Sequence, residues 1–172
     1  MPVNTLVYQR IVKELASTKT CLVAVSKTKP NEDLMELYHL GQRDFGENYV
    51  QELVDKAAAL PKDIHWHFIG HLQSNKVKYI APFVHLIHGV DSLKLLQEIN
   101  KQAIKNNRVI DCLLQIHIAE EETKFGLDEK ELEQIITQMD QLSNVRICGL
   151  MGMASFSEDQ MKVRNEFKYL NS

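Results

Sequence analysis

C-L-V-A-V-S-K-T-K-P-N-E-D-L-M-E-L-Y-H-L-G, from Cys21 to Gly41, contains the repeating unit of the predicted fold. Its beginning, Cys21–Ser26, is a short apolar run of the kind that forms a buried strand. Asn31 can then cap a helix that has acidic residues in its first turn, apolar residues at helical spacing and Gly41 at its end. The stretch therefore predicts a strand, a loop and a helix in that order.

The same alternation extends outward along the chain. An amphipathic helix over Thr5–Ala16 is predicted before the first strand, because Val7, Ile11 and Leu15 recur at helical spacing. Helical patterns also separate the later strands, and the crossover between parallel strands is usually a helix. The sequence thus predicts one α/β domain over residues 1–172. Its strands are expected at six runs: Cys21–Ser26, Arg43–Gly46, His65–Ile69, Val84–His88, Asp111–Ile118 and Val145–Leu150.

The third predicted strand has one polar face and one apolar face. His65, His67 and Ile69 share the first face, while Trp66 and Phe68 share the second. An apolar face suits packing against helices, and a polar face suits the mouth of a barrel that holds a polar ligand. We therefore expect a (β/α)8 TIM-type barrel rather than an open sheet, with about six of the eight strand–helix units present.

The composition excludes several classes of protein. The chain is 44% hydrophobic and 25% charged, which is close to an average globular domain. A net charge of -3 and a pI near 6.2 provide no basic field for nucleic acid. No apolar run approaches the roughly 18 residues of a membrane span, and no signal-peptide core is visible. We expect a cytoplasmic protein with neither nucleic acid nor a membrane as partner.

The three cysteines indicate a reducing compartment. Cys21, Cys112 and Cys148 are odd in number, far apart and outside any C-x-x-C pair. Each lies where an apolar strand is predicted to begin. We expect three buried free thiols without a metal or redox role.

Candidate site residues follow the predicted strands, because ligands of parallel α/β folds bind at the carboxyl ends of the strands. Lys27 continues the face of Val23 and Val25 and is expected at the barrel rim. Partial burial lowers the pKa of a lysine and provides the deprotonated amine that attacks a carbonyl. The alternative is an ordinary solvated lysine, and Lys29 is the competing amine.

Several histidines lie in or beside the strands. His67 either contacts a ligand ring or forms a hydrogen bond inside the core, and the second case is the commoner one. The same interpretation applies to His65, His85, His88 and His117, because no two of them have metal-site spacing with a matching carboxylate. We therefore expect no metal site.

Five stretches carry a family resemblance: V-A-V-S-K-T-K-P at Val23–Pro30, F-G-E-N-Y-V-Q-E at Phe45–Glu52, W-H-F-I-G-H-L-Q-S-N-K at Trp66–Lys76, E-E-E-T-K-F-G-L at Glu120–Leu127 and G-L-M-G-M at Gly149–Met153. In order and spacing they resemble the YggS/PROSC family of pyridoxal phosphate (PLP) homeostasis proteins. The resemblance runs from the first strand to the last residues of the chain.

The resemblance implies a PLP-binding barrel like the amino-terminal domain of alanine racemase. It implies that PLP forms a Schiff base with Lys27, that Asn48 and His67 lie near the cofactor, and that Met151 and Met153 line the barrel mouth. Family members are regarded as regulators of PLP supply without turnover of their own, with PLP-dependent apoenzymes as recipients. The alternative is a PLP-dependent racemase or decarboxylase, which needs a second acid/base group from another domain or subunit.

One departure from the family pattern concerns the end of the chain. The family's S-x-G-M-S and G-S-x-x-V-R-I-G stretches, which grip the phosphate, do not occur in this sequence. Since such barrels bind phosphate after strands seven and eight, we expect the last two strand–helix units to be missing and PLP to bind more weakly than in complete relatives. A monomer is expected, or a dimer if another chain covers the opening.

Overall fold

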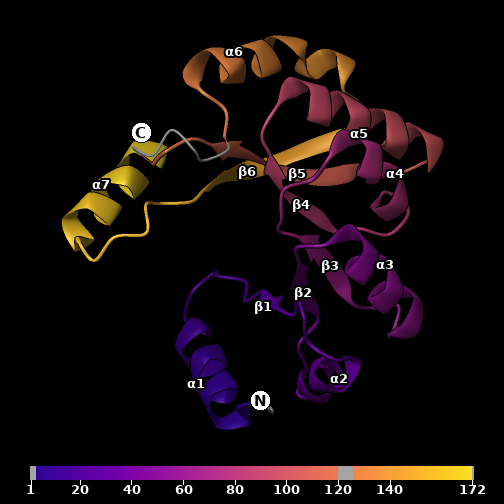
Figure 1. Cartoon of the computed structure of the whole chain (residues 1–172), viewed down its shortest axis with the longest axis vertical. Coiled ribbons are helices and arrows are strands. Elements are labelled where there is room, and N and C mark those ends of the chain that lie inside the picture. Colours follow the sequence, from indigo (N-terminus) through magenta and orange to yellow (C-terminus); the bar gives the residue numbers. More distant parts are fainter. Residues whose placement is uncertain (1–2, 120–125, 172) are drawn as a thin grey trace.

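A computed structural model describes residues 3–119 and 126–171 of the chain. Within them, helices alternate with strands along the chain (Figure 1). The strands are β1 (Ala24–Val25), β2 (Asp44–Glu47), β3 (His65–Phe68), β4 (Leu86–Val90), β5 (Ile110–Ile116) and β6 (Val145–Gly152). The α-helices are α1 (Thr5–Leu15), α2 (Asn31–His39), α3 (Val50–Ala59), α4 (Val77–Ile80), α5 (Leu93–Lys105), α6 (Glu129–Gln138) and α7 (Gln160–Leu170). The 3-10 turns η1 (Ser74–Lys76) and η2 (Met139–Gln141) precede α4 and follow α6.

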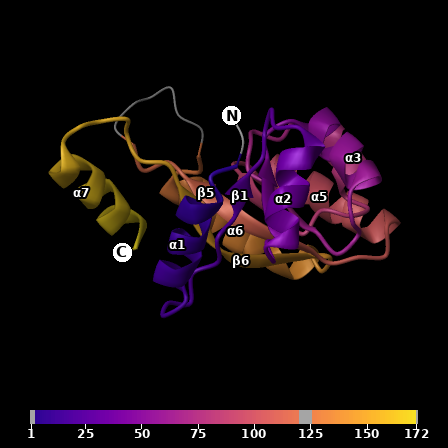
Figure 2. The same cartoon turned by 90° about the horizontal axis from the view of Figure 1, so that it is seen from below.

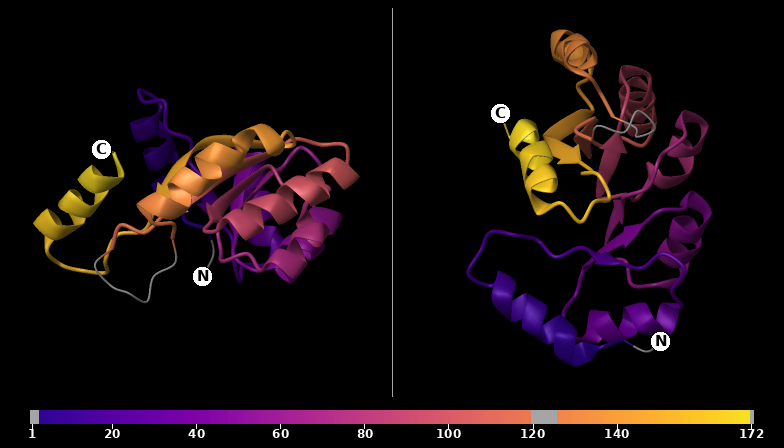
Figure 3. Two further views of the ribbon diagram at one scale, coloured as in Figure 1. Left: turned by 90° about the horizontal axis from the view of Figure 1, so that it is seen from above. Right: turned by 60° about the vertical axis from the view of Figure 1, so that its left-hand side comes forward.

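The six strands form one parallel sheet in the order β1-β2-β3-β4-β5-β6. Strand order that follows chain order, without a reversal, is the winding of a (β/α) barrel rather than of a doubly wound sheet. Accordingly, α2 to α6 curve around one side of the sheet, while α1 and α7 lie towards the other side (Figures 1 and 3). The predicted α/β class, the parallel sheet and the barrel-type winding are confirmed, and the sheet is open between β1 and β6 within the described residues.

The strand boundaries agree with the sequence prediction to within two residues, except at β1, which is reduced from Cys21–Ser26 to Ala24–Val25. The amide of Gln42 explains part of the difference, because its Nε2 donates to the Leu22 carbonyl at 2.8 Å and to the Asp44 carbonyl at 2.6 Å. A side chain thus bridges the two backbones where further ladder pairing was expected. The strand propensity of the local sequence cannot reveal that a side-chain hydrogen bond replaces a backbone one.

The hydrophobic core lies between the sheet and the α2–α6 layer. Phe45, Phe68 and Ile87 contribute fully buried side chains from three neighbouring strands, and Leu53 and Leu96 meet them from α3 and α5. Burying each such side chain stabilises the fold by about 1.5–3 kcal/mol. The predicted apolar face of β3 is therefore confirmed.

The cysteine prediction is only partly correct. Cys112 is buried on the central strand β5, but Cys21 and Cys148 are exposed. Cys21 precedes β1 and Cys148 belongs to β6, and these two strands form the edges of the sheet. A residue at an edge has a neighbouring strand on one side only, which apolar patterning along the chain does not disclose.

The amino and carboxyl-terminal helices pack less tightly than the others. No residue of α1 is buried, and α7 stands clear of the helical layer in the view from below (Figure 2). The segment before α7 is nevertheless fixed, because the Ser155 amide and hydroxyl both donate to Glu166 at 2.6 Å. In the part of the chain that is described, no helix is long and apolar enough to cross a membrane.

The start of α6 offers a stability test. Asp128 accepts from the Glu131 amide at 2.8 Å, and the Asp128 amide donates to Glu131 Oε2 at 3.0 Å, which is a complete capping box. We expect Asp128→Ala to lower the free energy of unfolding by about 1 kcal/mol in urea titrations. Glu133→Ala, an exposed change on the same helix, should have little effect. Equal losses in the two variants would contradict the assignment to the cap.

Candidate functional site

Four of the five predicted site residues lie at the carboxyl edge of the sheet. Lys27 comes two residues after β1 and is exposed, and Asn48 follows β2 directly and is half-buried. Since β1 and β2 are paired in parallel, these two residues leave the sheet at the same edge. Met151, which is half-buried, and Met153, which is 50% exposed, lie at the end of β6. The open sheet therefore brings Lys27 and Asn48 together and leaves the two methionines at the opposite side.

The loop that carries Lys27 has a defined backbone conformation. The Ser26 amide donates to the Gly46 carbonyl at 2.9 Å, and the Lys29 amide donates to the Ser26 carbonyl at 3.0 Å. Between them Thr28 has a φ of 60°, a left-handed conformation that is unfavourable for a β-branched residue. Such a conformation persists only where surrounding contacts hold it.

A buried charge network supplies those contacts. Lys56 Nζ lies 2.7 Å from Glu47 Oε1, 2.7 Å from Glu52 Oε1 and 2.7 Å from the Ser26 carbonyl. The Glu47 side chain is 0% exposed and that of Lys56 is 6% exposed. Ser26 Oγ also donates to Glu47 at 2.7 Å, and the Thr28 amide donates to Glu52 at 2.6 Å. The network thus attaches both residues that flank Lys27 to β2 and α3.

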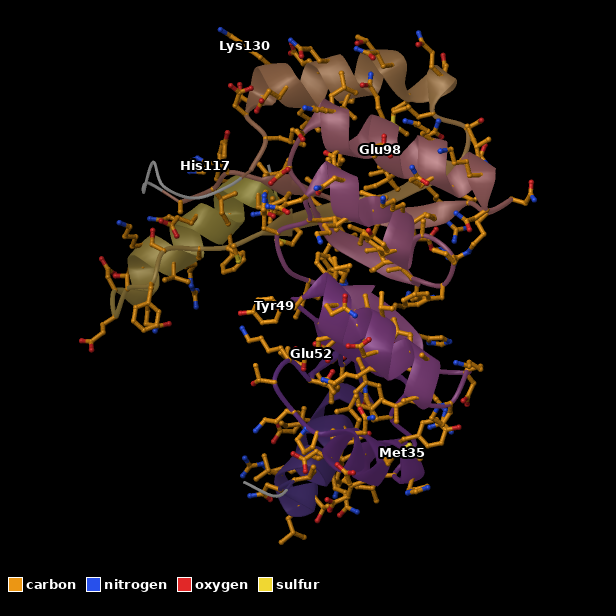
Figure 4. All side chains as sticks on the ribbon, turned by 45° about the vertical axis from the view of Figure 1, so that its right-hand side comes forward. Met35, Tyr49, Glu52, Glu98, His117 and Lys130 are labelled. Atoms are coloured by element: carbon orange, nitrogen blue, oxygen red, sulfur yellow. The ribbon has the colours of Figure 1, made fainter. Side chains whose placement is uncertain are left out.

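The sequence analysis did not identify this network. One part of it has a sequence signal, because Glu52 and Lys56 are separated by four residues on a helix, the spacing of a favourable ion pair. Figure 4 shows Glu52 beside Tyr49, where β2 leads into α3, while Met35 and Glu98 lie elsewhere in the helical layer. The partnership of Lys56 with Glu47 joins a helix to a strand and has no such signal.

The exposure of Lys27 differs from the expected partial burial. Its strand is an edge strand, with a neighbouring strand on one side only. Lys29 lies differently, because it lines a surface cavity of about 220 Å³ together with Ala24 and with Leu34 of α2. The two lysines are therefore in distinct surroundings.

Asn48 is fixed by the glycine that follows β3. A methyl group added at Gly70 would lie 2.4 Å from the Asn48 carbonyl oxygen and 2.9 Å from its Cα atom. Only glycine therefore allows the ends of β2 and β3 to approach this closely. Asn48 also lines a cavity of about 370 Å³, together with His71 and Lys76.

His67 lies inside the sheet rather than at its carboxyl edge. It is 4% exposed and shares a register row with Val25 and Gly46, so it lies two positions before the row of Lys27. Its Nε2 lies 3.0 Å from Asp44 Oδ1 and its Nδ1 lies 2.9 Å from His88 Nε2. Both ring nitrogens thus have protein partners, as in the core-histidine interpretation.

The surroundings of His67 determine the charges of its neighbours. Burial, together with the nearby His67 ring, lowers the pKa of His88 to about 4, so His88 is neutral near pH 7. Burial acts to raise the pKa of Asp44, but hydrogen bonds and positive charge from His67 and His65 outweigh it and hold that pKa below its ordinary value. Glu120 to Phe125, most of the fourth family-like stretch, lie outside the described residues.

Comparisons with known proteins identify the family to which the chain is similar. The family model described as alanine racemase, N-terminal domain, matches residues 8–172. The chain is 43% identical over 150 residues to the pyridoxal phosphate homeostasis protein of Aquifex aeolicus, covering 87% of this chain and 66% of that protein. It is 36% identical over 169 residues to the protein of the same name from Schizosaccharomyces pombe, covering 96% and 71%. The chain thus spans about two thirds of the length of these relatives.

Solved structures show the same similarity. PipY of Synechococcus elongatus PCC7942 without PLP superimposes with a TM-score of 0.87 at 33% identity, covering 95% of this chain and 78% of that chain. The structure of PipY with PLP bound gives a TM-score of 0.83 at 33% identity, covering 95% and 77%. Alanine racemase from Bartonella henselae, with covalently bound pyridoxal phosphate, shares the fold at a TM-score of 0.73 and 18% identity, covering 95% and 47%.

Proposed function

The chain belongs to the family of pyridoxal phosphate homeostasis proteins, built on the alanine racemase N-terminal domain, and from this we propose that it binds PLP through a Schiff base on Lys27. The observation that carries the proposal is the position of this amine. Lys27 stands at the carboxyl edge of the sheet, on a loop whose flanking residues are held by Glu47, Lys56 and Glu52. A fixed loop presents the amine in one place and lowers the entropy lost on binding.

The described residues fit such a cofactor. Gly46 pairs with Val25, two residues before Lys27, and a methyl group on Gly46 would be 3.0 Å from Ile69 and 3.1 Å from Val23. Glycine at this position therefore leaves room for two apolar side chains, against which the ring of the cofactor would pack. Asn48 offers an amide at the same edge of the sheet, and His67 lies in the register row of Gly46. In this proposal Met151 and Met153 line the far side of the mouth, at the end of β6.

The chemistry that PLP supplies when bound is an aldehyde that a primary amine captures reversibly. Lys27 would hold the cofactor through that aldehyde, with one water released on capture and one water taken up on release by hydrolysis. We propose that the chain carries PLP without turnover and passes it to PLP-dependent apoenzymes in the cytoplasm, with one chain as the binding unit. The names of the homeostasis relatives support this over a racemase, because the racemase structures share only the fold.

The Schiff base is tested by absorbance on titration with PLP. We expect an imine band in the wild-type chain, its loss in Lys27→Ala and its retention in Lys29→Ala, since Lys29 lines a separate cavity. Borohydride reduction followed by peptide mass spectrometry should place the label on Lys27. A label on Lys29, or an unchanged band in Lys27→Ala, would overturn the proposal.

The absence of turnover needs a separate experiment. The PLP-loaded chain is incubated with single-enantiomer amino acids, and enantiomer composition and carbon dioxide release are followed. We expect neither racemisation nor decarboxylation above the rate with free PLP. Sustained turnover that disappears in Lys27→Ala would replace the carrier assignment with an enzymatic one.

A further inference from the structure

A second polar cluster lies at the amino-terminal edge of the sheet, opposite to the edge that carries Lys27. Asp44 begins β2, His65 begins β3, and His85 immediately precedes β4. His67 lies two residues further along β3 and points into the same cluster. Three neighbouring strands therefore direct carboxylate and imidazole groups to one place.

The donor atoms are close enough for a single ion. One carboxylate oxygen of Asp44 and one ring nitrogen each of His67 and His85 all lie within 4.8 Å of one another. The shortest of these separations joins Asp44 Oδ1 to His67 Nε2 at 3.0 Å. A zinc ion bound at about 2.0–2.2 Å by tetrahedral ligands separates them by roughly 3.3 Å. The His85 ring, on an exposed residue, can supply the remaining adjustment by rotation.

We propose that Asp44, His67 and His85 bind one divalent transition-metal ion of the zinc type. Two imidazoles and one carboxylate form a donor set that suits zinc and its neighbours in the first transition row, and that calcium or magnesium does not prefer. Three protein ligands leave a fourth position for water. The Lys27 amine is not among the ligands, so the test of the metal site does not depend on the proposed PLP function.

Residues beside the three proposed ligands orient the ligand side chains, as hydrogen-bond partners of the ligands do in known metal sites. His88, being neutral, can accept from Nδ1–H of His67 across 2.9 Å, and this leaves Nε2 of His67 directed at Asp44. In that tautomer Nε2 of His67 carries the lone pair that binds a metal ion. His65 stacks on His85 with ring centroids 4.5 Å apart and lies 3.2 Å from Asp44.

The opposing interpretation is a purely structural hydrogen-bond network. The amino-terminal face of barrel folds commonly contributes to stability rather than to binding. In that case a proton lies between His67 and Asp44 and no ion is needed. Metal uptake distinguishes the two interpretations, because only the proposed site binds one ion per chain through these side chains.

The test uses tag-free, PLP-free protein and measures Zn²⁺ uptake by equilibrium dialysis and Co²⁺ uptake by visible absorption. We expect one ion per chain, with tetrahedral Co²⁺ bands. His85→Ala and Asp44→Asn should each weaken binding by about tenfold or more, since changes even to outer contacts cost 10–100-fold. His39→Ala, which removes an exposed histidine at the end of α2, is the matched control.

Two further results decide the proposal. Lys27→Ala should retain full metal uptake, which separates this site from the proposed aldehyde site. Circular dichroism of His85→Ala should match the wild type, because the residue is exposed. No stoichiometric uptake by the wild-type chain, or an equal loss in His39→Ala, would overturn the metal site and leave the structural network.

Discussion

Lys56→Met should lower the free energy of unfolding by about 3–5 kcal/mol, the loss that follows when one partner of a buried ion pair is removed. The Glu47 side chain is fully buried, and one of its oxygens, Oε2, has no hydrogen-bond partner in the described chain. Without the ammonium group, Glu47 Oε1 keeps only the Ser26 hydroxyl as a donor. The remaining carboxylate would be a buried charge without a cation.

The measurement is urea unfolding followed by circular dichroism, with Lys101→Met as matched control. Lys101 is on α5 with its side chain 61% exposed and pairs with Glu98 at 3.4 Å, so its loss should cost no more than about 0.5 kcal/mol. Adding Glu47→Gln to Lys56→Met should restore part of the stability, because the double variant no longer buries an unpaired charge. A double variant no more stable than Lys56→Met alone would contradict the electrostatic explanation.

The same variant connects stability to the proposed site. Lys56 Nζ donates hydrogen bonds to the Ser26 carbonyl and to the Glu52 carboxylate. The Glu52 carboxylate also accepts a hydrogen bond from the Thr28 amide. Without these contacts the left-handed conformation of Thr28 loses its support, and the Lys27 loop gains freedom. We therefore expect weaker PLP capture in Lys56→Met at temperatures where the chain is still folded, and unchanged capture in Lys101→Met.

The sequence was sufficient for the alternation of strands and helices, because several strands are short apolar runs and the helices between them have their own periodicity. Phe68 and Trp66 on one face of β3 and His67 on the other could be assigned from the alternation of side chains alone. The shortening of β1 could not be predicted, because it depends on hydrogen bonds from the side chain of Gln42, which lies just before β2. The exposure of Cys21 and Cys148 likewise depends on which strands are edges.

The side-chain clusters were harder to predict because they form between elements. A search for metal-site spacing compares residues along the chain, whereas Asp44, His67 and His85 belong to, or directly precede, three different strands and meet only when the sheet is assembled. The ion pair between Lys56 and Glu47 could not be predicted for the same reason, because Glu47 lies nine residues earlier, on the strand that precedes the helix. Lys27 could be selected because strand ends are known positions in this class of fold, even though its exposure was not foreseen.

Gly70→Ala should be destabilising by about 3 kcal/mol, the upper part of the usual range for overpacking, and should weaken PLP capture. The added methyl group would lie 2.4 Å from the carbonyl oxygen and 3.0 Å from the carbonyl carbon of Asn48. These are backbone atoms, so no rotamer change relieves the overlap. The ends of β2 and β3 have to separate, and Asn48 moves with them.

Two variants separate this steric effect from other consequences of losing a glycine. Gly41 has a φ of 99° with nothing within 4 Å of an added methyl, so Gly41→Ala measures conformational strain alone, about 1–2 kcal/mol. Gly41 precedes β2, whereas Asn48 follows it at the other end, so PLP capture should be unchanged. Asn48→Ala combined with Gly70→Ala should not recover stability, because the overlapping atoms remain. Recovery in that double variant, measured by urea unfolding, would show that the side chain of Asn48 and not the backbone approach requires glycine at position 70.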